Sequence, residues 1–221
     1  LNTGFGSLSK VRIDPEQVHE IQRHIVRSHA AGVGEALPND VVRGMMLLLA
    51  GSLSRGHSGV RIETVERLVW HLEHDVIPVV PSRGSVGASG DLAPLAHVAL
   101  ALIGEGTCRV SGEVVDTIDA LRNASLEGLV LEAKEGLALL NGTHLMAATG
   151  ALCCADAARL IETAIMGTAM SVDACRGSHG PFDPRIHEVR RQPGQCEVAR
   201  RVLELLEGSE IVGDHADDDP R

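Results

Sequence analysis

Aromatic side chains are almost missing from this sequence. Its 221 residues include one Trp, two Phe and no Tyr, so aromatics make up only 1% of the chain. The formal net charge is −10, because 30 Asp and Glu outnumber 20 Lys and Arg. Proteins that bind nucleic acids rely on basic surfaces and often on aromatic platforms. Both features are lacking, so nucleic acid is not an expected partner.

Long uninterrupted apolar runs and paired cysteines are lacking as well. The run from Leu92 to Ile103 is broken by Pro94 and His97, which indicates a buried helix rather than a membrane span. No charged segment followed by an apolar one indicates a signal peptide. The five cysteines show no paired spacing and favour a reducing compartment. We therefore expect a cytoplasmic protein without a membrane partner.

The residues that are present follow a mostly helical pattern. Capping residues and apolar spacings of three and four predict helices over about 14–31, 38–49, 62–76, 91–103, 143–174 and 196–207. Alternation from Cys108 to Val115 around Ser111-Gly112 predicts a β-hairpin. The prolines of residues 176–192 predict a loop.

Cysteine and histidine pairs within these helices give no sign of chemistry. Adjacent Cys153 and Cys154 lie in a helical pattern and are expected to pack in a core. His71 and His74 share a predicted helix but lack the Glu and the third ligand of a zinc site. No metal is therefore expected.

One glycine-rich loop, Gly84 to Asp91, needs a chemical explanation. The first alternative is a connecting loop whose glycines supply positive φ angles. The second is a phosphate cradle, which is weaker because no Gly-Lys-Ser/Thr follows and the spacing fits no dinucleotide fingerprint. The third is a tripeptide, Ala88-Ser89-Gly90, that processes itself.

The residue types of this tripeptide suit cyclisation. The amide nitrogen of Gly90 can attack the carbonyl of Ala88 and close a five-membered ring, because Gly has no Cβ to hinder a bent backbone and Ala is small. Ser89 can then lose its hydroxyl as water and leave an exocyclic methylidene. The product, a methylidene-imidazolone, is an electron-poor alkene. The helix after Asp91 would place the positive end of its dipole beside that group.

Four segments resemble motifs of the histidine and phenylalanine ammonia-lyase family, and they occur in the family's order across essentially the whole chain. They are Asn2-Thr3-Gly4-Phe5-Gly6, Ser28-His29-Ala30-Ala31-Gly32-Val33-Gly34, Gly87-Ala88-Ser89-Gly90-Asp91-Leu92-Ala93-Pro94-Leu95-Ala96 and Gly136-Leu137-Ala138-Leu139-Leu140-Asn141-Gly142-Thr143. The resemblance implies a carbon–nitrogen lyase that deaminates an amino acid without oxidation.

The resemblance also implies roles for individual residues. Ala88, Ser89 and Gly90 would form the methylidene-imidazolone autocatalytically, so no external cofactor, neither pyridoxal phosphate nor a metal, is implied. Asn141 would lie close to this electrophile and hydrogen-bond the ring or the substrate. Asp91 would support ring closure, and capping of the helix that follows it is compatible with that role.

Substrate choice is expected to depend on the pair Ser28-His29. This pair resembles the histidine-specific members, whereas Leu is typical at the second position of members that act on phenylalanine or tyrosine. A polar His can hydrogen-bond an imidazole, while Leu would pack on a benzene ring. The expected reaction is conversion of L-histidine to trans-urocanate and ammonia. The alternatives are a phenylalanine or tyrosine ammonia-lyase or aminomutase, and a non-catalytic helical fragment.

The implied fold is mainly α. Residues 1–110 would form a mixed N-terminal segment that carries the electrophile loop, and residues 111–221 would begin a long helical bundle that is truncated here. Family members are homotetramers whose active sites combine several subunits, so long apolar helices such as 143–174 would pack at subunit contacts.

Both ends of the chain are expected to be cut. The chain starts at Leu1, next to the first motif, and stops at Arg221 after an acidic stretch. Relatives place a Tyr just before the first motif, and a further Tyr and a carboxylate-binding Arg beyond the position of Arg221. The 221-residue chain by itself is therefore expected to be inactive.

Overall fold

The computed structural model describes residue 14, residues 17–87 and residues 90–211. Within this part of the chain, contacts divide the protein into two compact units, 1–152 and 153–221, and α7 continues from one into the other. The predicted domain boundary at residue 110 lies inside the first unit, at the turn between β4 and β5. The expectation of a mainly helical protein is confirmed.

The described residues of the first unit form six α-helices and the start of a seventh, together with five short strands. In chain order these elements are α1 (Val18–His29), β1 (Val33–Ala36), α2 (Asn39–Leu53), α3 (Ile62–Glu73), β2 (Ile77–Pro78), β3 (Pro81–Arg83), α4 (Leu92–Leu102), β4 (Thr107–Val110), β5 (Glu113–Asp116), α5 (Thr117–Asn123), α6 (Glu135–Leu140) and α7 (His144–Ala174). The strands form an antiparallel pair, β1-β3, and an antiparallel three-stranded sheet in the order β2-β4-β5.

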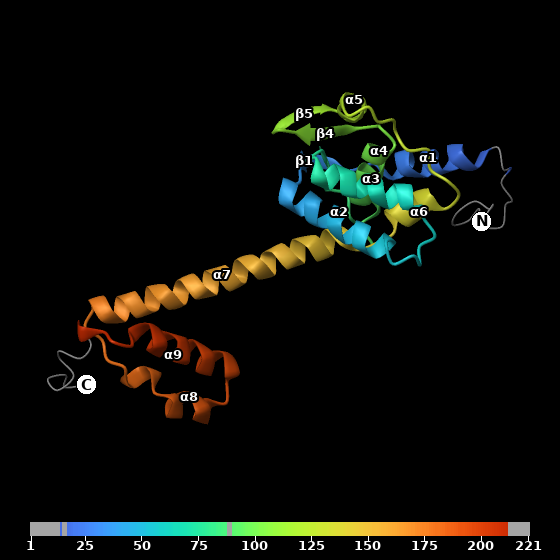
Figure 1. Cartoon of the computed structure of the whole chain (residues 1–221). Coiled ribbons are helices and arrows are strands. Elements are labelled where there is room, and N and C mark those ends of the chain that lie inside the picture. The colour runs from blue at the N-terminus through green and yellow to red at the C-terminus, as the bar shows by residue number, and fades with distance from the viewer. Residues whose placement is uncertain (1–13, 15–16, 88–89, 212–221) are drawn as a thin grey trace. The chain divides into compact units, whose positions relative to one another are not determined.

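The core of the first unit lies between α1, α2, α3, α4 and α6, which gather together in Figure 1. Helix α4 has no exposed residue, in agreement with apolar residues that cover its whole circumference rather than one stripe. The buried cluster includes Val26, Val42, Met45, Leu49, Leu68, Leu95, Ala99, Leu102, Leu139 and Leu140. The core therefore holds α4, and with it the end of the glycine-rich loop, in a fixed position.

The predicted hairpin is confirmed by its turn. Strands β4 and β5 pair in the register Cys108↔Val115, and Ser111 and Gly112 have φ angles of 52° and 88°. Two consecutive positive φ angles are those of the type I′ turn, whose twist matches paired strands. Local turn chemistry was sufficient here, because the strands meet across only two residues.

The second unit is helical. Up to residue 211, where its description ends, it contains the rest of α7, a short 3₁₀ helix η3 (Gly180–Phe182), α8 (Pro184–Arg190) and α9 (Pro193–Leu206). Its small core brings α7 against α9 through Ile165, Ala169, Val202 and Leu206. The predicted loop over 176–192 is therefore wrong for residues 184–190. The overlooked signal is Asp183-Pro184, because Asp183 accepts a hydrogen bond from the Arg185 amide and Pro184 occupies the first helical turn.

A burial prediction fails on a long helix. Cys153 and Cys154 are exposed on α7 rather than packed in a core. Helix α2 likewise has an apolar side chain on its outer face, since Leu47 is 63% exposed. Periodicity shows how apolar a helix is, but which face is covered depends on the elements that pack against it.

Helix α7 also bears on the membrane prediction. By length and composition alone, the helical stretch Glu135–Ala174 could cross a membrane. The sequence prediction considered only uninterrupted apolar runs. Helix α7 contains a few charged residues, but its many alanines keep the stretch apolar enough to span a membrane. Helix α7 carries large exposed apolar side chains along its length, namely Met146, Leu160, Ile161, Met166 and Met170. A covering surface outside the described residues is therefore expected for α7.

Candidate active site

The glycine-rich loop connects β3 to α4. Ala88 and Ser89 lie outside the described residues, so the surroundings of the predicted electrophile are built from its neighbours. Strand β3, which precedes the loop, pairs with β1 in the register Arg83↔Val33. At the start of the loop, a Cβ on Gly84 would lie 3.2 Å from Gly32 Cα. The fold thus brings the segment after His29 alongside the segment before the tripeptide.

Gly90, the last residue of the tripeptide, is buried and has a φ angle of 109°, which L side chains rarely adopt. A Cβ at this position would overlap the carbonyl oxygen of Gly142 and would lie 2.8 Å from its carbonyl carbon. Position 90 therefore accepts only glycine, the residue type that the cyclisation requires. The contact also joins the end of the loop to the segment that contains Asn141.

Asp91 holds three segments together. Its backbone N–H donates to the Gly142 carbonyl at 2.7 Å. Its fully buried carboxylate accepts hydrogen bonds from the Ser85 hydroxyl at 2.7 Å, from the Leu145 amide at 2.9 Å and from the Met146 amide at 3.1 Å. A carboxylate taken out of water needs such donors.

Asp91 caps a different helix from the one predicted. The Asp91 side chain makes no capping hydrogen bond to α4, the helix that begins directly after it. It instead accepts from the amides of Leu145 and Met146, which are unpaired donors at the N-terminus of α7. The negative charge also lies at the positive end of the α7 dipole. Tertiary contact thus replaced the local cap.

Asn141 follows α6 directly and has an extended backbone with φ of −89° and ψ of 109°. Its side chain is exposed, and its Nδ2 makes a long 3.5 Å hydrogen bond to the Leu137 carbonyl. Since the next residue, Gly142, contacts both Gly90 and Asp91, the Asn141 amide is held near the loop and remains open to a ligand. Its catalytic role stays a prediction.

His29 is the last residue of α1, and the structure defines its tautomer. Its Nδ1 lies 2.8 Å from the Ile25 carbonyl oxygen, to which a protonated Nδ1 donates. In the neutral ring, Nε2 is then a hydrogen-bond acceptor. Ser28 donates its hydroxyl to the same Ile25 carbonyl at 3.0 Å and lies 3.1 Å from His29 Nδ1. His29 thus offers an acceptor to a ligand, while the Ser28 hydroxyl bonds to its own helix.

One structural residue near the site was not predicted. Glu135, at the start of α6, is 1% exposed and accepts hydrogen bonds from the Arg61 guanidinium and amide, the Thr64 hydroxyl and the Glu132 amide. Burial by itself raises the pKa of Glu135, but these donors, Arg61 first, lower it to about 2. The sequence signal was a single acid in front of an apolar segment, which indicates a buried carboxylate with partners.

Glu135→Gln is expected to destabilise the protein by about 3 kcal/mol, because it leaves Arg61 and several donors without the charge they surround. A carboxylate with a lowered pKa stabilises the fold above its unfolded value near 4.5, and that contribution is lost as the pH falls toward 2. Unfolding followed by circular dichroism over this pH range measures both effects. Glu132→Gln, at a half-exposed carboxylate, is the matched control and should change stability little. Equal losses in the two variants would contradict the assignment.

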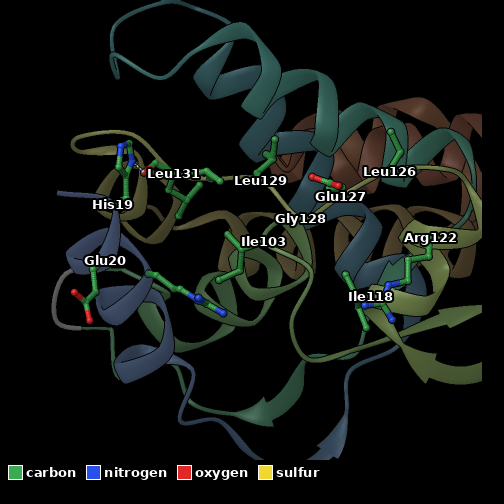
Figure 2. Close-up of a pocket in the computed structure, with 12 residues that line it drawn as sticks. His19, Glu20, Ile103, Ile118, Arg122, Leu126, Glu127, Gly128, Leu129 and Leu131 are labelled. Carbon is green, nitrogen blue, oxygen red and sulfur yellow. Dashed lines mark hydrogen bonds between the residues drawn. The ribbon is translucent and has the colours of Figure 1, made fainter. Parts of the chain in front are cut away.

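A large hollow of the first unit lies elsewhere. It has a volume of about 720 Å³, and Figure 2 shows His19 and Glu20 of α1 on one side and Ile118 and Arg122 of α5 on the other. Its walls carry charges of both signs, and none of the predicted site residues lines it. Size therefore does not identify the reaction site in this chain. Among the described residues, no group of three or more His, Cys, Asp or Glu is placed to hold a metal ion.

These features define a class of protein. A mainly helical fold holds a glycine-dependent loop against an Asn-Gly-Thr segment and against the segment that follows a helix-terminal His. The model of the aromatic amino acid lyase family matches residues 1–221, and the chain belongs to this family. Members of the family use a methylidene-imidazolone group.

Individual members of the family can be compared with this chain in sequence and in structure. The chain is 53% identical over 215 residues to a histidine ammonia-lyase of Deinococcus radiodurans, with 97% of this chain and 41% of that protein covered. Among solved structures, a histidine ammonia-lyase from Trypanosoma cruzi matches with a TM-score of 0.84 and 40% identity over 91% of this chain and 39% of that one. A tyrosine aminomutase from Streptomyces globisporus matches with a TM-score of 0.87 and 38% identity over 98% and 41%. The chain thus spans about two fifths of the length of these relatives.

Proposed function

We propose that the complete gene product, the whole protein to which this chain belongs, is a histidine ammonia-lyase. It converts L-histidine to trans-urocanate and ammonia. The observation that carries the proposal is the convergence of three motifs around Gly90: the segment after His29 lies beside the start of the loop, and Gly142 contacts Gly90 itself. The identity of about 50% to histidine ammonia-lyases supports the substrate.

The fit to the cofactor rests on the residues present. Gly90 has the left-handed backbone and the close approach to Gly142 that exclude any side chain, as cyclisation with Ala88 and Ser89 requires. The methylidene-imidazolone of residues 88–90 would supply an electron-poor alkene as the electrophile for covalent catalysis. The buried Asp91 carboxylate fixes Ser85 and the start of α7 around this loop.

The remaining residues act on the substrate. Nε2 of His29 accepts a hydrogen bond from the imidazole N–H of histidine and orients its ring. The exposed amide of Asn141 donates to the ring of the electrophile or to the substrate. Because Nδ1 of His29 is bonded to Ile25, the acceptor at Nε2 is set before the substrate arrives, and less ordering is left to the binding step.

The second candidate is an aminomutase or lyase acting on phenylalanine or tyrosine. It is favoured by one observation, the TM-score of 0.87 to a tyrosine aminomutase against 0.84 to a histidine ammonia-lyase. The fold therefore does not separate the two activities. Sequence identity and the acceptor at His29 support histidine.

The partners of the complete gene product are other copies of itself, in a homotetramer. The exposed apolar residues of α7 support this, because a helix with side chains such as Leu160, Ile161 and Met170 exposed needs a covering surface. We propose subunit packing rather than a bilayer, since the exposed face of α7 also carries Asp156, Arg159 and Glu162. The proposed location is the cytoplasm.

The test of the function is urocanate formation, followed by absorbance, with the purified complete gene product and L-histidine. Phenylalanine and tyrosine are the competing substrates, and their lyase and aminomutase products are measured in parallel. Turnover of an aromatic substrate with no urocanate formed would favour the second candidate.

His29→Leu is expected to impair histidine more than phenylalanine. The substitution removes the acceptor at Nε2, and a hydrogen bond to a substrate in a dry site contributes about 1–3 kcal/mol. Values of kcat/KM for both substrates measure the effect. His24→Leu is the control, because His24 is exposed on the same helix and faces Glu20. Equal losses on the two substrates would mean that His29 has a structural role.

A further inference from the structure

The short segment between His29 and β1 is held by few hydrogen bonds. The Ala30 amide closes the last turn of α1 on the Val26 carbonyl at 3.1 Å, and the Ala31 amide bonds to the His29 carbonyl at 2.8 Å. The next amide, that of Gly32, donates to a side chain, Nε2 of His97, at 3.2 Å. This bond ties the segment to a different element, α4, before β1 begins.

The ring of His97 also determines the space around Gly32. A Cβ on Gly32 would lie 3.0 Å from His97 Nε2 and 3.2 Å from Pro81 Cβ. An Nε2 that accepts from an amide leaves the ring proton on Nδ1, so His97 acts in its neutral form. Burial lowers the pKa of His97, in agreement with that form.

His97 lies on the helix that follows the electrophile loop, and Gly32 lies close to His29 in the chain. Helix α4 begins two residues after Gly90, and its apolar side chains are locked in the core of the first unit. Gly32 lies three residues after His29. A hydrogen bond from the Gly32 amide to His97 therefore connects the rigid helix that follows the electrophile loop to the short segment after His29, in addition to the packing of α1 against α4.

We propose that His97 is a positioning residue for substrate recognition: its Nε2 fixes the Gly32 backbone and so sets His29 at the distance from the electrophile loop that suits an imidazole substrate. This inference rests on the proposed function. His97 does not touch the substrate, and its effect passes through Gly32 to His29. An aromatic substrate that makes no hydrogen bond to His29 depends less on this placement.

Two substitutions separate positioning from simple packing. His97→Phe keeps a flat ring on α4 but removes the acceptor, so the Gly32 amide loses its partner. His97→Gln makes less apolar contact with its neighbours, but it places an amide oxygen near the former position of Nε2, where it can accept from the Gly32 amide. His24→Gln, on the exposed face of α1, is the control. All are made in the complete gene product and assayed with histidine and phenylalanine.

The expected result for His97→Phe is an increase in KM for histidine of about tenfold, with a much smaller change in kcat and in phenylalanine turnover. His97→Gln should restore most of the histidine KM. The mass of the peptide that spans Ser89 should be unchanged in both variants, because the electrophile still forms.

Three outcomes would overturn the inference. They are equal losses on both substrates, a lack of rescue by Gln, and an unprocessed Ser89 peptide in His97→Phe, which would assign His97 to formation of the electrophile instead. Failure of the proposed function is distinguishable, because the unsubstituted protein would then form no urocanate.

Discussion

Ser89→Ala is expected to lower deamination of histidine by several orders of magnitude in the complete gene product. Ala has no hydroxyl to lose, so residue 89 cannot supply the methylidene carbon on which covalent catalysis depends. The β-proton of an amino acid is weakly acidic and ammonia leaves poorly, so the other residues cannot replace an electrophile. Stability should change little, because the two side chains differ by one atom.

Mass spectrometry gives an independent check on Ser89. The peptide that spans residues 88–90 should lack two water molecules in the unsubstituted protein and should not do so in Ser89→Ala. Ser82→Ala is the matched control, since Ser82 is an exposed residue of β3 in the strand before the loop. Turnover near that of the unsubstituted protein in Ser89→Ala, or an unmodified peptide from an active preparation, would rule out the role of the tripeptide.

Gly90→Ala is expected to be as damaging to activity as Ser89→Ala, for a different reason. The added Cβ would overlap the Gly142 carbonyl, which is backbone and already accepts the Asp91 amide. Residue 90 also has a φ of 109°, a conformation that alanine rarely adopts. The loop or the segment after Asn141 must shift, and both the cyclisation and the Asp91 contacts would be lost.

Gly87→Ala is the matched control within the same loop. Gly87 also has a positive φ, of 68°, but a Cβ there meets no atom within 4 Å. Its cost should be about 1 kcal/mol of backbone strain, with the ring still formed. Activity and the mass of the Ser89 peptide are measured for both variants. Similar effects of the two substitutions would show that strain alone, and not the contact with Gly142, governs the loop.

Local sequence was sufficient where one short segment contains the whole signal. The I′ turn at Ser111-Gly112 needs only two residues of permissive backbone, and the helices from Asn39 and Ile62 follow from spacing. The motif around Ala88-Ser89-Gly90 was recognisable because the cyclisation draws on consecutive residues. The family and the mainly helical fold were therefore predictable before any coordinates.

Predictions from the sequence failed where a contact or the burial of a residue depends on a second, distant element. Asp91 caps α7 rather than α4, and nothing near Asp91 in the chain indicates the amides of Leu145 and Met146. Cys153 was expected in a core because of its residue type and the helical pattern around it, but it is exposed. The hydrogen bond from Gly32 to His97 joins two segments whose own patterns describe a helix end and a buried helix.

By itself, then, the sequence determined the family, the main helices and the residue types of the electrophile, because these depend on local propensity and on bonds between chain neighbours. Tertiary structure decided which distant segments meet: Gly142 with Gly90, Asp91 with α7 and Gly32 with His97. The physical reason is that such contacts are fixed by packing of the whole core, where α4 lies against α1, α3 and α6.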